Sequence, residues 1–166
     1  TDTGDIAAKA RFRVDPDTVT ARELYDRHLA ALTDLLPDLL TRIDAGDVPR
    51  FPQDAAGASV CARRRPEDGR IDWTAPADEI HRLIRGVGPP YPGAFTDDVD
   101  GKRLVITKAQ HTPREGYYIG LPGQVQDIDG HSFTVSCGDR RCLDILVWSG
   151  PDAPPRRHTK LGGGPK

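Results

Sequence analysis

The sequence of 166 residues contains no methionine, only three cysteines, and 6% aromatic residues. It also lacks any run of about 18 apolar residues, the length that a membrane-spanning helix requires, so no membrane partner is predicted. No signal peptide is visible at the N-terminus. The absence of an initiator methionine makes truncation of a longer chain the simplest interpretation.

The cysteines, Cys61, Cys137 and Cys142, are odd in number and lack the spacing of a zinc site. They are typical of small apolar side chains in a reducing compartment, which predicts a cytoplasmic location and no metal. Cys137 and Cys142 flank a predicted turn. A cross-strand contact between them, with a disulfide on oxidation, therefore stays open at this point.

The charge is nearly balanced, with 23 basic and 25 acidic residues and a net charge of −2. Residues 1–73 contain 11 basic and 14 acidic residues, and residues 74–166 contain the remaining 12 and 11. Neither half has the basic excess that is typical of proteins that bind nucleic acid through charge alone.

A helix is predicted over residues 21–45. Thr20 and Glu23 form a capping-box pattern at its start, and Gly46 is placed to end it. Pro37 lies inside this span and predicts a kink or a break. One helix face is formed by Leu24, His28, Leu29, Leu32, Leu35, Leu36, Leu39, Leu40 and Ile43. This stripe is typical of packing.

Residues 6–14 and 59–63 have the composition of short strands. The charged run 63–70 that follows is interpreted either as a solvated loop or as a clamp for an anionic group. A second helix is predicted between Trp73 and Gly88, with Thr74 as N-cap and Pro76 in the first turn. Gly88 is expected to adopt a left-handed C-cap, and residues 89–95 to form a stiff corner.

The pattern then changes to strands at 103–108, 123–128, 131–137 and 142–148. Turns are predicted at 98–101, 129–130 and 138–139. Short antiparallel strands at this spacing favour a small barrel with a Greek-key or OB-like path. The remaining residues are rich in proline and glycine and predict a flexible tail over 151–166.

Several of these segments resemble the folate-dependent formyltransferases, a family that includes methionyl-tRNA formyltransferase and the nucleotide-sugar N-formyltransferases. The resemblance rests on Asp-Thr-Gly at 2–4, Ile-Asp-Trp at 71–73, Ile-Arg-Gly at 84–86 and Pro-Pro-Tyr-Pro-Gly-Ala-Phe-Thr at 89–96. It implies an α/β remnant of a Rossmann-like formyltransferase domain with its linker at 1–73. A helix plus an OB-like barrel would follow at 74–150. The upstream part of the formyl-donor domain would be missing.

The resemblance also implies the chemistry. The family transfers a formyl group from 10-formyltetrahydrofolate to a primary amine, and uses an Asn–His–Asp set to do so. Asp2 matches the Asp of that set. Its Asn and His partners have no counterpart in this sequence, so we expect the chain alone to be inactive. We assign Arg64, Arg85 and Tyr91 as substrate-binding residues on the same resemblance.

The run Arg-Arg-Arg-Pro-Glu-Asp at 63–68 is similar to that of the nucleotide-sugar enzymes, and it favours an amino sugar on a nucleotide carrier, or a similar small amine, as the acceptor. Methionyl-tRNA, with initiator tRNA as the partner, is the alternative. A third reading is a non-catalytic OB-like module that binds single-stranded nucleic acid or protein. Such modules stack bases on aromatic side chains, and the predicted strands carry few besides Phe133 and Trp148.

Overall fold

A computed structural model describes residues 3–163 of the chain, which divides into two compact units. The first comprises residues 1–19 and 23–64, and the second comprises residues 20–22 and 65–166. The division after Arg64 lies before the boundary expected near residue 74. Its position reflects Ile71 and Trp73, which are both buried in the core of the second unit.

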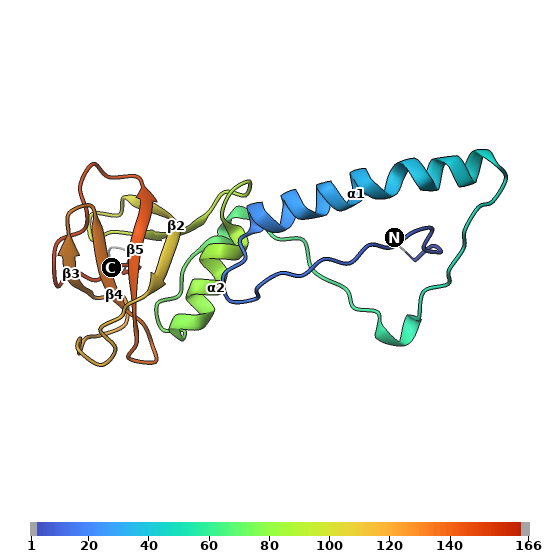
Figure 1. The fold of residues 1–166 in the computed structure, drawn as a ribbon. Coiled ribbons are helices and arrows are strands. Elements are labelled where there is room, and N and C mark those ends of the chain that lie inside the picture. The colour runs from blue at the N-terminus through green and yellow to red at the C-terminus, as the bar shows by residue number, and fades with distance from the viewer. Residues whose placement is uncertain (1–2, 164–166) are drawn as a thin grey trace. The chain divides into compact units, whose positions relative to one another are not determined.

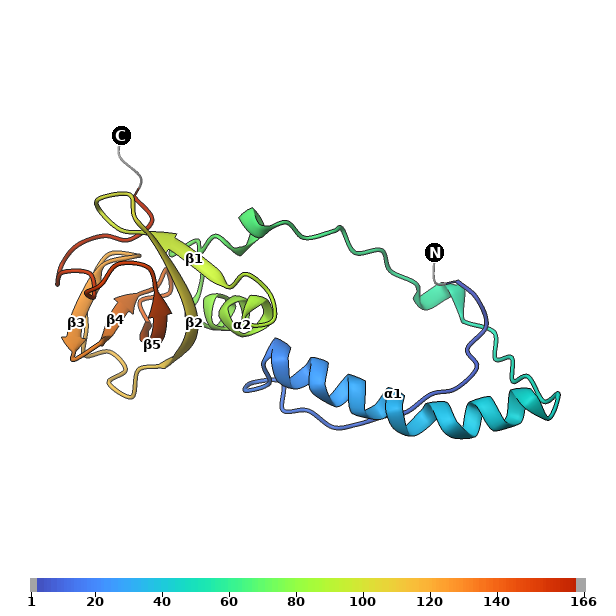
Figure 2. The same cartoon turned by 90° about the horizontal axis from the view of Figure 1, so that it is seen from above.

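The first unit is built around the helix α1, Ala21–Asp44, which Figures 1 and 2 show as one long continuous helix. The predicted helix is confirmed, and Gly46 follows it with a positive φ of 82°. A kink or a break was predicted at Pro37, and the helix continues through this residue without a break. No residue of α1 is buried, so solvent can satisfy the Thr33 carbonyl that Pro37 leaves without its helical donor.

The strands predicted over 6–14 and 59–63 are wrong. Among the described residues of these segments, the backbone pairs only at one bridge, between Ile6 and Phe51. A short 3₁₀ turn at Ala55–Gly57 is the other regular element of the unit. Alternating side chains favour a strand only where a neighbouring strand can accept its backbone hydrogen bonds. The Rossmann-like remnant is therefore not confirmed.

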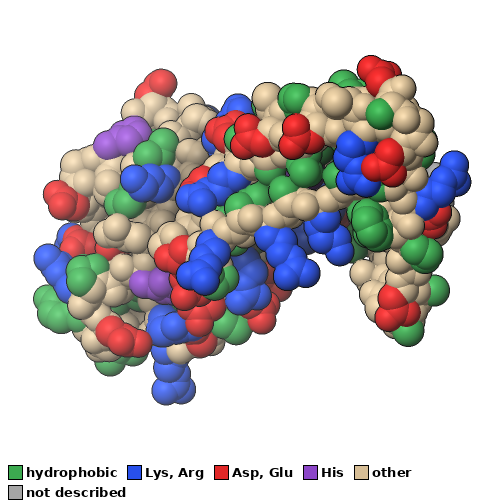
Figure 3. All heavy atoms as spheres, turned by 45° about the vertical axis from the view of Figure 1, so that its right-hand side comes forward, with side chains coloured by type: hydrophobic (Ala, Val, Ile, Leu, Met, Phe, Trp, Pro, Cys, Tyr) green, Lys and Arg blue, Asp and Glu red, His purple; other side chains and the backbone are tan. Residues whose placement is uncertain are grey.

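Most of the leucine stripe of α1 is exposed, with 52% of Leu29, 47% of Leu36 and 55% of Leu40 accessible to solvent, whereas Leu35 and Leu39 are half-buried. Hydrophobic side chains of this unit are visible at the surface in Figure 3. The stripe was interpreted as a packing surface whose cover belongs to a missing part of the domain, and the described residues provide no second layer for it. Within residues 3–163, α1 and the other helices lack the combination of length and hydrophobicity that crossing a membrane requires.

The second unit is an antiparallel sheet with one helix. Its strands are β1 Ala94–Asp97, β2 Arg103–His111, β3 Val125–Asp129, β4 Ser132–Ser136 and β5 Cys142–Ser149. They lie in the order β1-β2-β5-β4-β3, and each neighbouring pair is antiparallel. A 3₁₀ turn, η2 Pro66–Gly69, and the helix α2, Ala77–Val87, precede the sheet. The four predicted strands are confirmed, whereas β1 was not predicted.

A bulge in β2 keeps its apolar side chains on the inner face. Leu104 and Ile106 are buried at alternate positions, but the next buried residue is Ala109. The register with β5 shifts twice between these positions. Thr107 of β2 and then Leu146 of β5 are left without a partner, so the original register resumes at Ala109. Without this irregularity the inward alternation would place Lys108 in the core.

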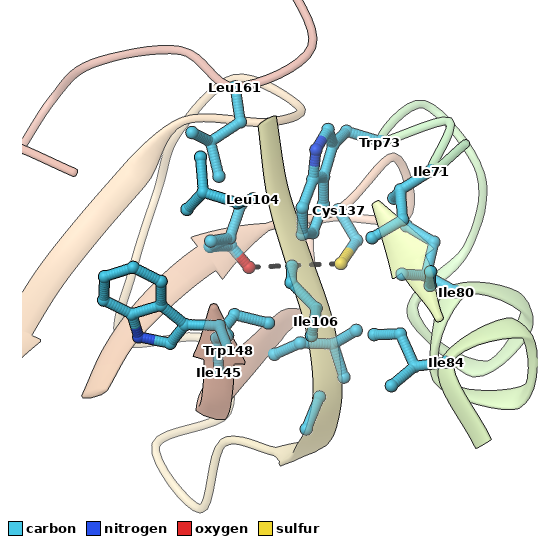
Figure 4. Packing of buried hydrophobic residues seen from close by; sticks show 14 of the residues in the cluster. Ile71, Trp73, Ile80, Ile84, Leu104, Ile106, Cys137, Ile145, Trp148 and Leu161 are labelled. Carbon is cyan, nitrogen blue, oxygen red and sulfur yellow. Dashed lines mark hydrogen bonds between the residues drawn. The ribbon is translucent and has the colours of Figure 1, made fainter. Parts of the chain in front are cut away.

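The helix α2 covers the sheet through one face (Figure 4). Ile80 and Ile84 point toward Ile106 of β2, and each of the three is at most 2% exposed. Trp73, just before the helix, donates from Nε1 to Thr96 Oγ1 of β1 at 3.0 Å. Burying apolar area of this kind contributes about 25 cal/mol per Å², so this face supplies most of the attraction between helix and sheet.

Both ends of α2 differ from the prediction. The Thr74 hydroxyl donates to Asp72 rather than capping the helix, and Pro76 occupies the N-cap position without a side-chain bond of its own. Gly88 is extended, with φ −65° and ψ 179°, rather than left-handed. Pro89 explains the second difference, because a residue that precedes proline is driven into the extended region.

Part of the expected flexible tail is bonded to the sheet. Residues 158–161 run beside the start of β3, where the N–H groups of His158 and Leu161 donate to the carbonyls of Val125 and Gly123. The Leu161 side chain is 2% exposed. Gly162 N then donates to the Asp97 carbonyl at 2.8 Å. The tail thus bridges β3 and β1, the two edge strands of the sheet.

Cys137 and Cys142 are both buried and unpaired. Ser136 lies directly opposite Cys142 in the hairpin, so these two side chains share one face. Cys137, the next residue, belongs to the opposite face and packs in the core. This register disfavours the cross-strand disulfide. Burial raises the pKa of Cys137 to about 12, so its thiol is unreactive.

Gly138 provides the sharpest test of how α2 docks. A Cβ at this position would overlap the carbonyl oxygen of Thr74, and Gly138 N donates to the Ala75 carbonyl. We expect Gly138→Ala to lower the free energy of unfolding by about 1–3 kcal/mol, because the helix start must move away. Urea unfolding monitored by tryptophan fluorescence measures it.

The matched control is Gly86→Ala, on the exposed side of α2, where an added Cβ meets nothing within 4 Å. That substitution should leave stability unchanged or raise it by up to about 1 kcal/mol, the helix-propensity difference. Equal effects of the two alanines would contradict the docking described for Gly138.

Candidate functional site

The start of α2 is capped by a side chain from the turn between β4 and β5. Asp139 Oδ2 accepts a hydrogen bond from Ala77 N at 3.2 Å. The adjacent Gly138 N donates to the Ala75 carbonyl at 3.0 Å. A carboxylate at a helix N-terminus accepts from an N–H that has no helical partner and interacts favourably with the helix dipole. The turn therefore supplies the cap that the helix sequence lacks.

Arg141 ties this cap to the helix surface. Its Nε donates to Asp139 Oδ2 at 2.7 Å, and its two terminal nitrogens donate to the two carboxylate oxygens of Asp78 at 3.3 and 2.6 Å. Asp78 lies in the first turn of α2 and also contacts His111 Nε2 at 3.2 Å. We call Asp78, Asp139 and Arg141 the α2 clamp.

The three side chains of the α2 clamp stabilise one another in their ionised forms. The hydrogen bonds from Arg141 lower the pKa of Asp78, and the bonds to Asp78 and Asp139 raise the pKa of Arg141. Burial favours a higher pKa for Asp139, but its hydrogen bonds from Arg141 and Ala77 outweigh that effect and lower the pKa. All three groups are therefore ionised at neutral pH.

His81 makes a second tie between α2 and the sheet. Its Nε2 lies 3.1 Å from the Ala109 carbonyl oxygen, which can only accept, so Nε2 carries a hydrogen. Its ring meets that of His111 edge-on, with 5.0 Å between centroids. Burial lowers the pKa of His81, and the positive charge of Arg85 lowers it further. The imidazole is accordingly neutral at physiological pH.

A polar hollow of about 560 Å³ opens on the sheet. Its floor contains a cross-strand row of four paired residues, Gln110 of β2, Asp144 of β5, Thr134 of β4 and Asp127 of β3. Thr134 donates from Oγ1 to Asp144 Oδ1 at 2.8 Å. The rest of the lining comes from Thr112, Pro113, Arg114, Tyr118, Ile128, Asp129, Ser132, Phe133 and Leu146.

One wall of the polar hollow is a fixed hydrogen-bond network around Asp127. Tyr118 OH donates to Asp127 Oδ2 at 2.8 Å, Arg114 Nη1 donates to Tyr118 OH at 3.0 Å, and Arg157 bonds to Asp127 Oδ1. The bond from Tyr118 lowers the pKa of Asp127, whereas burial and that same bond raise the pKa of Tyr118. The network joins the β2–β3 loop to the tail.

The polar hollow is rich in hydrogen-bond acceptors. Asp129 and Asp144 also line it, and within the described part of the chain neither has an ion-pair partner. Residues 3–163 contain no group of three or more His, Cys, Asp or Glu side chains arranged to hold a metal ion. The lining thus suits groups that donate hydrogen bonds, such as hydroxyls and amines.

Two guanidinium groups stack on one buried ring at the β1–β2 hairpin. Arg70 and Arg103 lie 4.8 and 4.1 Å from the centroid of Phe95, which is 5% exposed. Arg70 Nη1 also donates to Asp97 Oδ2 at 2.7 Å. Stacking holds both guanidinium planes in place while leaving N–H donors directed outward.

The residues assigned from the sequence occupy separate places. Asp2 lies outside the described residues. Arg64 is the last residue of the first unit and is exposed. Arg85 is half-buried in the last turn of α2, and Tyr91, 55% exposed, lies in the corner that follows the helix. The second unit brings Arg85 and Tyr91 to the same end of α2.

The α2 clamp was missed in the sequence. Gly138 and Asp139 were recognised only as a turn, and the partner of Asp139 lies 62 positions away at Ala77. The structure places Pro76 at the N-cap instead of the predicted Thr74, and proline offers no capping side chain. The prediction of Thr74 as the cap therefore concealed the need for an acceptor from elsewhere in the fold.

Comparison with known proteins identifies related chains. Residues 63–149 match the family model described as "Formyl transferase, C-terminal domain". A methionyl-tRNA formyltransferase of Symbiobacterium thermophilum is 38% identical over 142 residues, which are 86% of this chain and 43% of the relative. One from Chlamydia caviae is 37% identical over 157 residues, 92% of this chain and 48% of the relative. The chain thus spans less than half the length of either.

A solved structure has a similar fold. The N-formyltransferase from Helicobacter canadensis, in complex with folinic acid and dTDP-3-aminofucose, superposes with a TM-score of 0.60 over 87% of this chain and 50% of its own. The sequences are 22% identical. Likeness at this identity establishes the common fold, with five antiparallel strands and α2 in this chain.

The state of His81 predicts a pH dependence. Its pKa in the folded protein lies below the usual value of 6.5, so the unfolded chain binds its proton first as the pH falls. The free energy of unfolding should therefore decrease from pH 6.5 downward and level off below the folded pKa. Urea unfolding at intervals from pH 8 to pH 5 measures the slope.

His81→Gln keeps a donor for the Ala109 carbonyl and cannot titrate, so it should flatten the slope in this range. His28→Gln, on the exposed α1 helix of the other unit, is the control and should retain the slope. An unchanged profile for His81→Gln would refute the role of this imidazole.

Proposed function

The chain belongs to the formyl transferase family through its C-terminal domain, and on that premise we propose that the complete protein formylates methionyl-tRNA. The observation that carries this proposal is the 38% and 37% identity to two methionyl-tRNA formyltransferases over 86% and 92% of the chain. The acceptor in this proposal is the amino group of methionine attached to initiator tRNA. The methionyl-tRNA alternative therefore replaces the amino sugar as the favoured acceptor.

The amino sugar on a nucleotide carrier remains the second candidate. It is favoured by the arginine run at 63–65 and by the fold shared with an N-formyltransferase whose complex contains dTDP-3-aminofucose. The identity to that protein is 22%, against 38% for the first relative, which places this candidate second. The non-catalytic module has no such support.

The formyl donor in this proposal is 10-formyltetrahydrofolate. The two hollows described in residues 3–163 do not suit it. The polar hollow contains three carboxylates, which would repel the acidic tail of a folate. The hollow of about 400 Å³ beside α1, where Arg11, Arg27 and Asp34 lie, is open to solvent. On the family resemblance, we assign the donor site to the formyl-donor domain of the complete protein.

We assign Arg85 and Tyr91 of the second unit to the acceptor site, and Arg64 of the first unit stays a separate substrate-binding prediction. Arg85 and Tyr91 lie at the end of α2, and guanidinium and aromatic side chains suit the phosphates and bases of an RNA acceptor end. Arg103, stacked on Phe95, offers a further donor to phosphate. We also propose that the second unit is an OB-like barrel, and the tail segment that bonds to both β1 and β3 supports this assignment.

The cytoplasmic location of the protein stays a prediction.

The acceptor assay tests the proposal. The complete parent protein is incubated with 10-formyltetrahydrofolate and either methionyl-tRNA or a nucleotide-linked amino sugar. We expect formylation of methionyl-tRNA, with a turnover at least about tenfold above that for the sugar. An enzyme discriminates between two acceptors by binding the transition state of the correct one more tightly. The reverse ranking would assign the nucleotide sugar as substrate, and no transfer to either would reject both candidates.

Asp2→Asn in the complete protein tests the assigned catalytic residue. If Asp2 stabilises the protonated form of a histidine, loss of its charge should reduce turnover by about 10²–10⁴-fold with little change in acceptor binding. Asp5→Asn is the matched control and should stay within a few-fold of wild type. Full turnover in both variants would remove Asp2 from the catalytic set.

A further inference from the structure

We propose that the α2 clamp holds Arg85 and Tyr91 in place for the acceptor, which makes Asp139 and Arg141 positioning residues of the reaction. This inference rests on the proposed function, because it takes the end of α2 as an acceptor-binding surface. It adds residues from the turn between β4 and β5 to that surface.

The first step is the attachment of α2 at its start. Asp139 Oδ2 accepts from Ala77 N at 3.2 Å, and Gly138 N donates to the Ala75 carbonyl at 3.0 Å. These bonds run in opposite directions between two short segments. They therefore fix how far along its axis the helix lies relative to the β4–β5 turn.

The second step is the rotation of the helix. The planar fork of Arg141 meets both oxygens of Asp78 at 3.3 and 2.6 Å, which a rotated helix would break. His81, three residues further on, bonds to the Ala109 carbonyl of β2 at 3.1 Å. These two attachments, one to the β4–β5 turn and one to β2, come from neighbouring positions on one helix face and leave the helix a single orientation.

The third step is the link between the orientation of α2 and the positions of Arg85 and Tyr91 at its C-terminal end. The helix has 11 residues, and Ile80 and Ile84 anchor it in the core. The corner after the helix is bonded to it, because Gly93 N donates to the Val87 carbonyl at 2.8 Å and Tyr91 N donates to the Gly88 carbonyl at 3.0 Å. Arg85 and the backbone of Tyr91 therefore follow any movement of α2.

The solvent exposure of the α2 clamp side chains indicates a role beyond stabilising the fold. The side chains of Asp78 and Arg141 are 54% and 35% exposed. Ion pairs at this exposure contribute little to stability, since water screens the charges. A bidentate fork nevertheless fixes geometry closely, which is the property that a positioning role requires.

The test uses Asp139→Ala in the complete parent protein, with Asp98→Ala as the matched control. Asp98 also fixes a turn through its carboxylate, accepting from Asp100 N at 2.9 Å and Lys102 N at 2.8 Å, but it has no bond to α2. The Michaelis constants for methionyl-tRNA and for the formyl donor are measured together with Tm.

Asp139→Ala should raise the KM for methionyl-tRNA on the order of tenfold, because small displacements of binding groups are costly, and leave the donor KM unchanged. Asp139→Asn retains an oxygen for Ala77 N and should give an intermediate value. Asp98→Ala should lower Tm without changing either KM. Equal acceptor KM values for Asp139→Ala and wild type, or equal rises in both KM values, would overturn the proposal.

Hydrogen exchange separates this inference from the proposed function. If the wild-type protein fails to formylate methionyl-tRNA, the proposed function is rejected, and amide exchange alone decides the clamp. Asp139→Ala must then accelerate exchange at Tyr91 and Gly93, beyond the far end of α2. Acceleration confined to the first turn of the helix would show a local cap and overturn the positioning role.

Discussion

The second unit depends on a helix that cannot complete its own first turn. Ala77 begins α2 after a proline, and no nearby side chain accepts from its N–H. The acceptor is Asp139, from a turn that exists only when β4 and β5 pair. Helix start and hairpin therefore require each other, and Arg141 reinforces the pairing by bonding to carboxylates on both. Apolar contact attracts α2 to the sheet, but these bonds select one placement.

The parts predicted correctly were those determined by local patterns. Glycines such as Gly101 and Gly130, both with positive φ, marked the hairpin turns, and alternation marked the strands beside them. The strand β1 was missed because Ala94, Phe95 and Thr96 are all buried and show no alternation. The strand predicted over 6–14 was wrong for the opposite reason. Its side chains alternate, but the segment has no neighbouring strand to pair with.

The candidate site was less predictable because its residues meet through the tertiary register. The resemblance directed attention to Arg85 and Tyr91, which do lie at one end of α2. Nothing local connected Asp139 to that helix. The cross-strand row of the polar hollow was equally hidden, since it requires Gln110 to pair with Asp144, Asp144 with Thr134 and Thr134 with Asp127 across four strands. Pairing partners decide which polar side chains share a face, and single-sequence patterns leave them undetermined.

The tail beside β3 also affects how the protein behaves among other chains. An edge strand with free backbone groups recruits strands from neighbouring molecules and thereby promotes aggregation. Here the segment from His158 to Gly162 occupies a backbone donor and acceptors at the start of β3 and the Asp97 carbonyl of β1, with Leu161 buried in the core. Proteolysis just before His158 would therefore leave the start of β3 open to pairing with strands of neighbouring molecules, whereas β1 would keep its pairing with Arg70 and Ile71.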